Sequence, residues 1–250
     1  MKKKTPTLTI ITICYNIKDE IERTCKSIVN QTWQDFEWIV VDGGSTDGTV
    51  DVLKKYADRI DVLISEPDKG IYNAMNKGIK LAHDKWLNFM NGGDCFAAND
   101  VLEKVFKNKE YDADVLYGNM LFHRKNQTVC KVCYPNVLRK SFFYDKCINH
   151  QSAFFRSDVF KKYGVFDENF KISADVEYWI RLLDSRVSFQ HLDQYVARFY
   201  EGGISNNSQY TSQQVKEKNK IFVKYNVKQE KNVQTFKLFV FLPLLKIEEA

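Results

Sequence analysis

Two acidic residues in the first 100 positions, Asp42 and Asp94, are placed for ligand chemistry because each follows an apolar run. Asp42 ends the run Ile39–Val41 and precedes two glycines, which can form turns closed to other residues. Asp94 ends the sequence Asn91-Gly92-Gly93-Asp94, directly after the run Trp86–Met90. Mg²⁺ and Mn²⁺ are commonly held by one or two carboxylates together with substrate phosphates, so Asp94 is a candidate metal ligand.

Alternating strand and helix signals predict how these acids are positioned. Strands are predicted at Leu8–Ile13, Ile39–Val41, Ile60–Ser65 and Trp86–Met90, with helices between them. Right-handed crossovers place the carboxyl ends of such parallel strands on one edge of the sheet, where open α/β sheets bind ligands. Tyr15 and Asn16 follow the first strand, so we expect them beside Asp42. A tyrosine at this edge can stack on a flat ring, and a core position is the alternative.

The helix predicted from Ile71 to Ala82 carries two amides that suit ligand contacts. Asn73 and Asn76 are three positions apart and therefore point the same way. They follow an acidic and basic turn that contains Asp68. A solvated helix face would be rich in Glu and Lys, so these three residues are candidate ligand contacts, with an ordinary surface position as the alternative.

The composition limits the classes of function. The chain has 250 residues, a net charge of +5, 44% hydrophobic and 28% charged residues, as expected of a folded protein. Its lysines are scattered, so nucleic acid is not predicted as a partner. Cys130 and Cys133 lack a second pair that would complete a zinc site. No signal peptide is recognised at the start, so a cytoplasmic location is expected.

The second half contains two further candidate groups. His150-Gln151 precedes the apolar run Ser152–Phe155, and a lone histidine there is either structural or functional. Asp175 lies near the first turn of a predicted helix, where an acid also fits the helix dipole. A hairpin is predicted over Phe122–Cys133, and Glu201–Ser205 suits a mobile lid after a strand at Tyr195–Tyr200.

The chain is predicted to divide into a domain and a tail. The domain covers residues 1–225, with a first half at about 1–100 and a second half at about 101–212. A tail over 226–250 contains the apolar run 236–247. This run is shorter than the ~20 residues that span a bilayer. It suits a segment lying in a membrane surface, and packing back on the domain is the alternative.

Four stretches in order resemble a known family. They are Thr12–Asn16, Val41–Thr49, Glu66–Gly78 and Asn91–Asp94. Together they resemble family-2 glycosyltransferases over about residues 7–205. These are inverting nucleotide-sugar enzymes with the A-type glycosyltransferase fold. The resemblance implies an α/β fold with a Rossmann-like mixed central sheet flanked by helices.

The resemblance makes residues 1–225 a catalytic domain, with a nucleotide-sugar half at about 1–100 and an acceptor half at about 101–212. It also implies roles for the candidate residues. Tyr15 would lie against the nucleobase and Asp42 would bond to it, with Asn16, Asp68, Asn73 and Asn76 as further nucleotide contacts. Asp94 would hold the Mn²⁺ or Mg²⁺ that binds the diphosphate, His150 and Gln151 would contact donor or acceptor sugar, and Asp175 would be the base. One departure is that the usual signature reads Asp-x-Asp-Asp. Asn91 and Gly93 replace its first two acids, which puts the ribose contact in doubt.

The predicted function is inverting transfer of a sugar from a nucleotide-diphosphate-sugar, with uracil favoured over guanine as the base. The acceptor would be a hydroxyl of a glycan or of a polyprenyl-diphosphate-linked acceptor in cell-surface polysaccharide synthesis, at the inner membrane face. Two alternatives are a nucleotide-sugar binding protein without turnover and a nucleotidyltransferase. The latter would need an acid pair and a basic triphosphate loop. The sequence names neither the sugar, nor the linkage, nor the oligomeric state.

Overall fold

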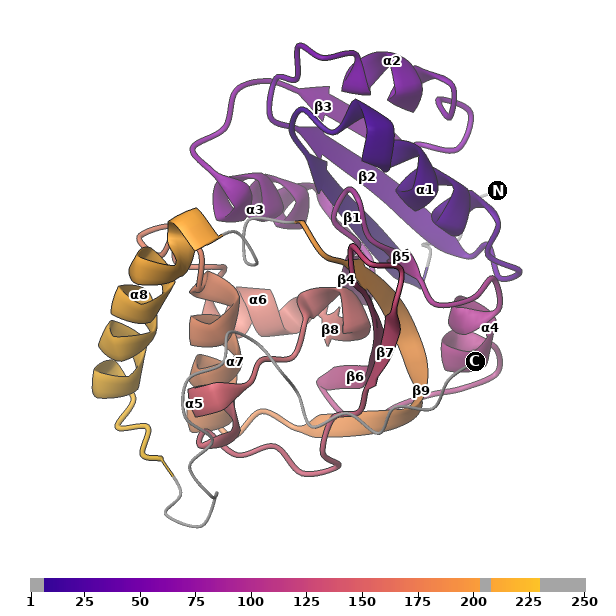
Figure 1. Cartoon of the computed structure of the whole chain (residues 1–250). Helices are drawn as coiled ribbons and strands as arrows, with labels where there is room; N and C mark the ends of the chain where they lie inside the picture. The colour runs from indigo at the N-terminus through magenta and orange to yellow at the C-terminus, as the bar shows by residue number, and fades with distance from the viewer. Residues whose placement is uncertain (1–6, 203–207, 230–250) are drawn as a thin grey trace.

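The protein is built around one mixed β-sheet that lies between two layers of helices (Figure 1). The computed structural model describes residues 7–202 and 208–229. The strand order is β3-β2-β1-β4-β8-β6-β9-β5, and β7 pairs with β6. The predicted membrane-surface segment 236–247 and most of the predicted lid lie outside the described residues. Within these, no helix is long and apolar enough to cross a bilayer.

The first half forms the predicted parallel unit. Its strands are β1 (Leu8–Cys14), β2 (Phe36–Asp42), β3 (Val62–Ser65) and β4 (Trp86–Phe89), joined by helices α1 (Lys18–Val29), α2 (Thr49–Lys54) and α3 (Ile71–Leu81). All four predicted strands are present and pair in parallel. Cys14 is paired with Asp42, so the residues after β1 and at the end of β2 share one edge of the sheet.

The second half makes the sheet mixed. Its strands are β5 (Cys95–Phe96), β6 (Val115–His123), β7 (Val129–Val132), β8 (Ala153–Arg156) and β9 (Phe189–Tyr200). Strand β8 is antiparallel to both β4 and β6 and so joins the two halves. The predicted hairpin is confirmed as the antiparallel pair β6–β7. The strand predicted at Tyr195 begins earlier, at Phe189, because its first residues pair in parallel with β6.

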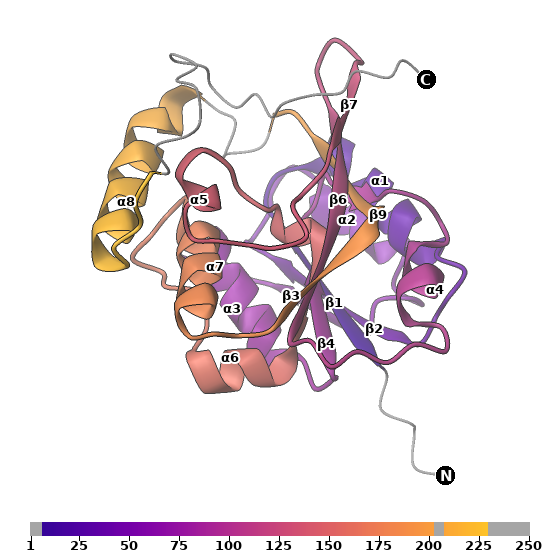
Figure 2. The ribbon, with the colours of Figure 1, turned by 90° about the horizontal axis from the view of Figure 1, so that it is seen from below.

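The remaining helices of the second half surround these strands. They are α4 (Val101–Phe106), α5 (Phe142–Asp145), α6 (Ser157–Tyr163), α7 (Ala174–Asp184) and α8 (Thr211–Lys224), with short 3₁₀ turns at His150–Ser152 (η1) and Ser208–Tyr210 (η3). Helices α3, α6 and α7 lie on one side of the sheet, whereas α1, α2 and α4 lie on the other (Figure 2). Helix α8 lies beside α7, away from the sheet (Figures 1 and 2).

Two buried clusters hold the layers together, one on each face of the sheet. Ile11 and Val41 pack with Met75 of α3, whereas Ile10 and Val40 face the layer of α1. Both faces of these strands are therefore apolar, which explains their unbroken hydrophobic runs. This arrangement keeps the strand ends rigid where the candidate residues emerge.

Candidate functional site

The turn after β2 is organised by the carboxylate of Asp42. Its oxygens accept hydrogen bonds from the backbone N–H groups of Gly44 and Ser45 and from the hydroxyls of Ser45 and Ser65. Burial opposes ionisation, but the hydrogen bonds from Ser45 and Ser65 outweigh it and hold the pKa of Asp42 below its usual value. Asp42 is 0% exposed. The turn itself thus uses this carboxylate, and the predicted bond between Asp42 and a base stays a prediction.

Tyr15 and Asp68 form an open surface over the same turn. The Tyr15 side chain is 60% exposed, so the predicted alternative of a core position is wrong. Gly43 leaves room for both, since a Cβ atom there would lie 2.6 Å from Asp68 Oδ2 and 3.2 Å from Tyr15 Cδ2. Asp68 Oδ1 accepts the N–H of Gly70 at 2.7 Å. Its Oδ2 atom makes no hydrogen bond among the described residues, so it is free to accept one from a ligand beside the tyrosine ring.

The three predicted amide contacts are engaged within the protein. Asn16 Oδ1 accepts the N–H of Thr46 and so ties the end of β1 to the turn after β2. The amide nitrogens of Asn73 and Asn76 donate to Glu168 at 2.9 and 2.8 Å. Asn76 is buried and also bonds to the backbone of Phe166. The amides of Asn73 and Asn76 thus join α3 to the segment before α7, and their predicted contacts with the nucleotide stay predictions.

Asp94 is a buried acid at the predicted metal position. Its Oδ2 accepts the Gln151 amide at 2.6 Å, and its Oδ1 accepts the N–H of Tyr200 at 3.1 Å. Burial raises the pKa of Asp94 to about 7, although these hydrogen bonds and the nearby His150 and Arg23 partly offset the rise. A nearby cation would therefore strongly favour the ionised form of this carboxylate.

Two residues near Asp94 carry buried oxygen atoms of the kind that a hard divalent cation binds. Asn91 Oδ1 and Gln151 Oε1 are buried and find no hydrogen-bond partner among the described residues. Carbonyl and carboxylate oxygens are the ligands that Mg²⁺ and Mn²⁺ prefer. The described residues contain no cluster of three or more His, Cys, Asp or Glu side chains that could hold a metal alone. One carboxylate with amide oxygens fits a cation that takes its remaining ligands from substrate phosphates and water.

The histidine beside Asp94 links the predicted metal position to Asp175. His150 Nε2 lies 2.8 Å from the Asn91 amide nitrogen. Its Nδ1 atom is buried, has no hydrogen-bond partner among the described residues, and lies 3.7 Å from Asp175 Oδ2. Gln151, the next residue, holds Asp94. The structure thus brings together Asp94, His150, Gln151 and Asp175, whose predicted roles stay predictions.

Asp175 has one oxygen held by the protein and one turned to the site. Its Oδ1 accepts the hydroxyl of Tyr72 at 3.0 Å and the N–H of Val176 at 2.8 Å. Its Oδ2 makes no hydrogen bond among the described residues and faces His150. The side chain is 18% exposed. A partly buried carboxylate with one fixed and one open oxygen is suited to accept a proton from a bound hydroxyl group.

Three residues of the site were missed by the sequence analysis. Tyr72 was not among the predicted site residues, yet it is buried and reaches Asp175. Glu168 accepts hydrogen bonds from the side-chain amides of Asn73 and Asn76 in α3. The backbone N–H of Tyr200 donates to Asp94. Each contact joins residues more than 90 positions apart. No local pattern in the sequence could have shown them.

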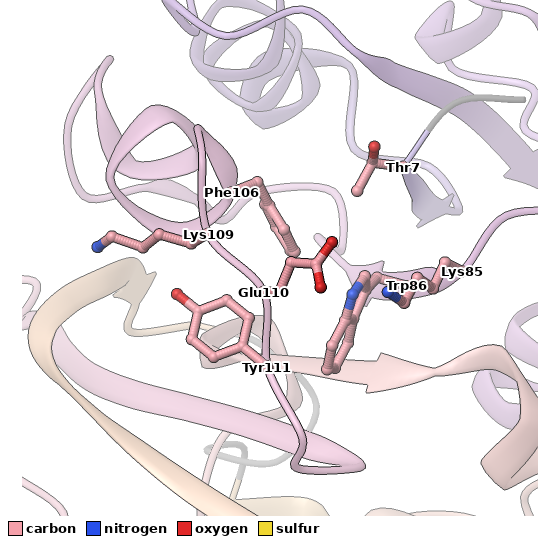
Figure 3. A pocket seen from close by; sticks show the side chains of 7 residues that line it. All are labelled: Thr7, Lys85, Trp86, Phe106, Lys109, Glu110 and Tyr111. Carbon is pink, nitrogen blue, oxygen red and sulfur yellow. The ribbon is translucent and has the colours of Figure 1, made fainter. Parts of the chain in front are cut away.

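A separate pocket of about 340 Å³ lies at the other end of the strands (Figure 3). It is lined by Thr7, Lys85, Trp86, Phe106, Lys109, Glu110 and Tyr111. Thr7 precedes β1 and Lys85 precedes β4, so this pocket is at the amino ends of these strands. Asp42 and Asp94 are at the carboxyl ends of β2 and after β4. The pocket is therefore not part of the candidate site.

Comparison with known families assigns the chain. The family model described as "Glycosyl transferase family 2" matches residues 9–168, which include Asp42, Asp94 and His150. The chain belongs to glycosyl transferase family 2. The predicted family is thereby confirmed, and the chain is a glycosyltransferase. Asp175 and α8 lie beyond the matched residues.

Curated relatives match most of the glycosyltransferase chain. A PGL/p-HBAD biosynthesis glycosyltransferase of Mycobacterium bovis is 29% identical over 208 residues, which cover 80% of this chain and 80% of the relative. An uncharacterized glycosyltransferase of Mycobacterium tuberculosis is 34% identical over 179 residues, which cover 70% of this chain and 68% of the relative. These alignments extend the family likeness beyond the first half of the chain.

Solved structures show the fold of this glycosyltransferase. Staphylococcus aureus TarS 1–349 in complex with UDP has a TM-score of 0.63 at 18% identity, covering 78% of this chain and 60% of that chain. Mannosyltransferase PcManGT from Pyrobaculum calidifontis, in complex with GDP-Man and Mn²⁺, has a TM-score of 0.65 at 18% identity, covering 88% and 64%. This chain spans less than two thirds of either solved chain. The predicted A-type glycosyltransferase fold is confirmed.

Proposed function

We propose that this glycosyltransferase moves a sugar, with inversion, from a uridine or guanosine diphosphate sugar to a hydroxyl group. The observation that carries the proposal is the open Oδ2 oxygen of Asp175, 3.7 Å from His150 Nδ1 and in the same network as Asp94. A sugar hydroxyl is a poor nucleophile at neutral pH, and inversion requires a base on the face opposite the leaving diphosphate. Asp175 meets this requirement from the second half of the chain.

The nucleobase is proposed to bind between Tyr15 and Asp68. The exposed Tyr15 ring offers a face for stacking, and Asp68 Oδ2 offers a hydrogen-bond acceptor beside it. Uracil and guanine both carry a ring N–H next to a carbonyl and can donate to this carboxylate. Adenine and cytosine have no such ring N–H at neutral pH. The solved complexes of TarS with UDP and of PcManGT with GDP-Man fit these two bases.

In the proposed reaction, Asp175 Oδ2 takes the proton of the attacking hydroxyl while Tyr72 and Val176 hold Oδ1 in place. The hydroxyl oxygen bonds to the anomeric carbon as the bond from that carbon to the diphosphate oxygen breaks. Asp94 and the amide oxygens of Asn91 and Gln151 would hold Mn²⁺ or Mg²⁺, which supplies positive charge against the leaving diphosphate. The His150 ring lies beside the catalytic base Asp175 and bonds to Asn91.

The acceptor is proposed from the family resemblance alone. It is a hydroxyl of a glycan or of a polyprenyl-diphosphate-linked acceptor, used in cell-surface polysaccharide synthesis at the inner membrane face. The relative from Mycobacterium bovis, named for PGL/p-HBAD biosynthesis, also acts in a biosynthetic pathway by its name. The membrane contact is assigned to the segment 236–247, outside the described residues.

Release of nucleoside diphosphate from a panel of nucleotide-sugars, with Mn²⁺ and mixed glycan acceptors, tests the function. We expect turnover with at least one uridine or guanosine donor and loss of it in Asp175→Asn. Donor binding without release of nucleoside diphosphate would favour a binding protein. That alternative is considered because Asn91 and Gly93 replace two acids of the family signature. Release of pyrophosphate from a nucleoside triphosphate would instead show a nucleotidyltransferase.

A further inference from the structure

The segment before α7 is held by a carboxylate from α8, a helix outside the residues matched by the family model. Glu217 of α8 accepts the backbone N–H groups of Lys171, Ile172 and Ser173 at 2.8, 2.9 and 2.9 Å. Glu217 is buried, with 7% of its surface exposed. Hydrogen bonds from backbone N–H groups to a buried carboxylate are charge-assisted and among the stronger ones in proteins.

These three residues directly precede the proposed base. Ser173 is the N-cap of α7, and Asp175 is the second residue of that helix. The N–H groups of residues 171–173 lie ahead of the helix, where its own carbonyls cannot satisfy them. Glu217 supplies that acceptor, so the position of the first turn of α7 depends on a side chain more than 40 residues later.

The same segment is held from the opposite side by α3. The hydroxyl of Tyr72 lies 2.8 Å from the carbonyl oxygen of Ile172 and 3.0 Å from Asp175 Oδ1. Ile172 is therefore bonded through its N–H to Glu217 and through its carbonyl to Tyr72. Two helices from distant parts of the chain thus fix the backbone that presents Asp175.

A second contact attaches α8 to α7 without touching residues 171–173. Lys224 and Tyr225 donate to Glu177 Oε1 at 3.0 and 2.5 Å. Arg181 also bonds to Glu177, so the buried Glu177 carboxylate keeps a partner if Lys224 is replaced. Replacing Lys224 therefore weakens the attachment of α8 at its C-terminal end and serves as a control.

We propose that Glu217 is a positioning residue for the base Asp175. The proposal rests on the proposed function, in which Asp175 takes the proton of the attacking hydroxyl. Glu217 touches no substrate in this scheme. By fixing residues 171–173 it holds Asp175 Oδ2 at the place where the hydroxyl binds, and α8 thereby becomes part of the catalytic domain in function as well as in packing.

The test compares Glu217→Gln with Lys224→Met in the full chain. The amide that Glu217→Gln introduces would place an NH₂ group where backbone N–H groups now need an acceptor. Hydrogen–deuterium exchange of the peptide that contains residues 171–173 should become faster by about 10-fold or more in Glu217→Gln and stay unchanged in Lys224→Met. The transfer rate constant should fall by about 10- to 100-fold, because small displacements of a catalytic group are costly. The donor Kd, measured by titration of the nucleoside diphosphate, should change less than about two-fold.

The outcomes separate this proposal from the proposed function. Unchanged exchange at 171–173 in Glu217→Gln overturns the positioning role, whatever the activity. Suppose that Glu217→Gln shows faster exchange but transfers at the wild-type rate, while Asp175→Asn is inactive. The claim that Glu217 positions Asp175 for catalysis is then overturned. An equal loss of transfer in Lys224→Met and Glu217→Gln also overturns it, because general loosening of α8 would then suffice. If Asp175→Asn transfers normally, the assignment of the base fails, whereas the exchange result still decides whether Glu217 holds the segment.

Discussion

The hydroxyl of Tyr72 lies 3.0 Å from Oδ1 of Asp175, although the two residues are 103 positions apart. Tyr72 belongs to α3, which follows the loop of Asp68, whereas Asp175 lies in the first turn of α7. The contact therefore connects the first half of the molecule with the proposed base. Burial raises the pKa of Tyr72 well above its usual value, and the nearby Asp175 charge adds to the rise, so the phenol stays protonated and donates. This hydrogen bond leaves Oδ2 as the oxygen available to a substrate.

The first prediction concerns the metal position. Asp94→Ala should abolish transfer, because no other carboxylate of the described residues takes its place beside Gln151 and Tyr200. Loss of the cation exposes the charge that develops on the diphosphate, an effect of several kcal/mol. Asp158→Ala, which removes an exposed acid paired with Lys161, is the control. Full activity of Asp94→Ala, or of the wild-type chain in excess chelator, would contradict the metal role.

The second prediction concerns recognition of the base. Asp68→Asn should weaken uridine or guanosine diphosphate binding by about 1.5–3 kcal/mol, the usual value of a hydrogen bond to a charged group. Its thermal stability should change little, since only the Gly70 N–H depends on this side chain. Glu66→Gln in the same loop, which removes an ion pair with Lys77, provides the comparison. Isothermal titration with four nucleoside diphosphates measures both affinity and selectivity. Unchanged affinity for all four would remove Asp68 from the base pocket.

The third prediction separates Asp42 from Asp68. Asp42→Ala should lower the free energy of unfolding by about 3 kcal/mol or more, because the buried carboxylate loses four hydrogen bonds from partly buried donors and a hydrogen bond to a charged group contributes about 1.5–3 kcal/mol. Ser65→Ala removes only one of those donors and should cost less. Denaturant unfolding gives both values. If Asp42→Ala is stable but has lost nucleotide affinity, the result would support direct contact between Asp42 and the nucleobase.

These predictions show what the sequence could and could not specify. The strand ends that carry Asp42 and Asp94 were predictable, because an apolar run followed by glycines has a strong local signal. The partners of those residues were not. The Ser65 hydroxyl donates to Asp42 from the neighbouring strand. Glu168 accepts a hydrogen bond from the amide of Asn73, 95 positions away in the sequence. Such contacts depend on how distant segments pack, which a single sequence does not encode in any spacing.

The start of β9 was missed for a different reason. Residues 189–194 include Gln190, Asp193 and Gln194, so they lack the apolar run that marked the other strands. They form a strand because β6 lies alongside and pairs with them. The pattern of burial along β9 is correspondingly mixed. Here tertiary pairing overrides local preference, as it often does in strands.

The fourth prediction concerns the stability of the chain against pH. Burial raises the pKa of Asp84 to about 6, and the nearby Glu37 and Asp35 add to the rise. The folded chain thus binds the Asp84 proton more tightly than the unfolded chain does. The contribution of this proton to the free energy of unfolding is therefore greatest at low pH and is lost as the pH rises through about 6. Asp84→Asn cannot ionise and should be more stable than the wild type by about 1–3 kcal/mol at pH 8.

The difference between Asp84→Asn and the wild type should shrink towards pH 4, where Asp84 is protonated in the folded chain and about half protonated in the unfolded chain. Thermal unfolding at several pH values between 4 and 8 measures it. The exposed acid Asp58, changed to Asn, serves as the control and should show no such trend. A variant that is less stable than the wild type at every pH would mean that the Thr9 hydroxyl, 2.8 Å from the carboxylate, requires the charge.

The fifth prediction concerns the base itself. An amide keeps the shape of the side chain and can still accept the Tyr72 hydroxyl and the Val176 N–H through its oxygen. It cannot take a proton from a hydroxyl group. Asp175→Asn should therefore bind donor almost normally, while transfer falls by about 10² to 10⁴, the usual share of general-base catalysis. Asp184→Asn, at the other end of α7, is the matched control because it loses only an exposed contact with Lys140.

Two measurements on Asp175→Asn give independent numbers. Titration with nucleoside diphosphate gives donor affinity, and product release under saturating donor gives the transfer rate. A rate within a few-fold of the wild type would show that Asp175 serves only the start of α7. The base would then be sought at His150, whose Nδ1 atom lies 3.7 Å away, because Glu177 is fully buried and paired with Arg181. A large loss of rate with intact affinity would instead support Asp175 Oδ2 as the atom that receives the proton.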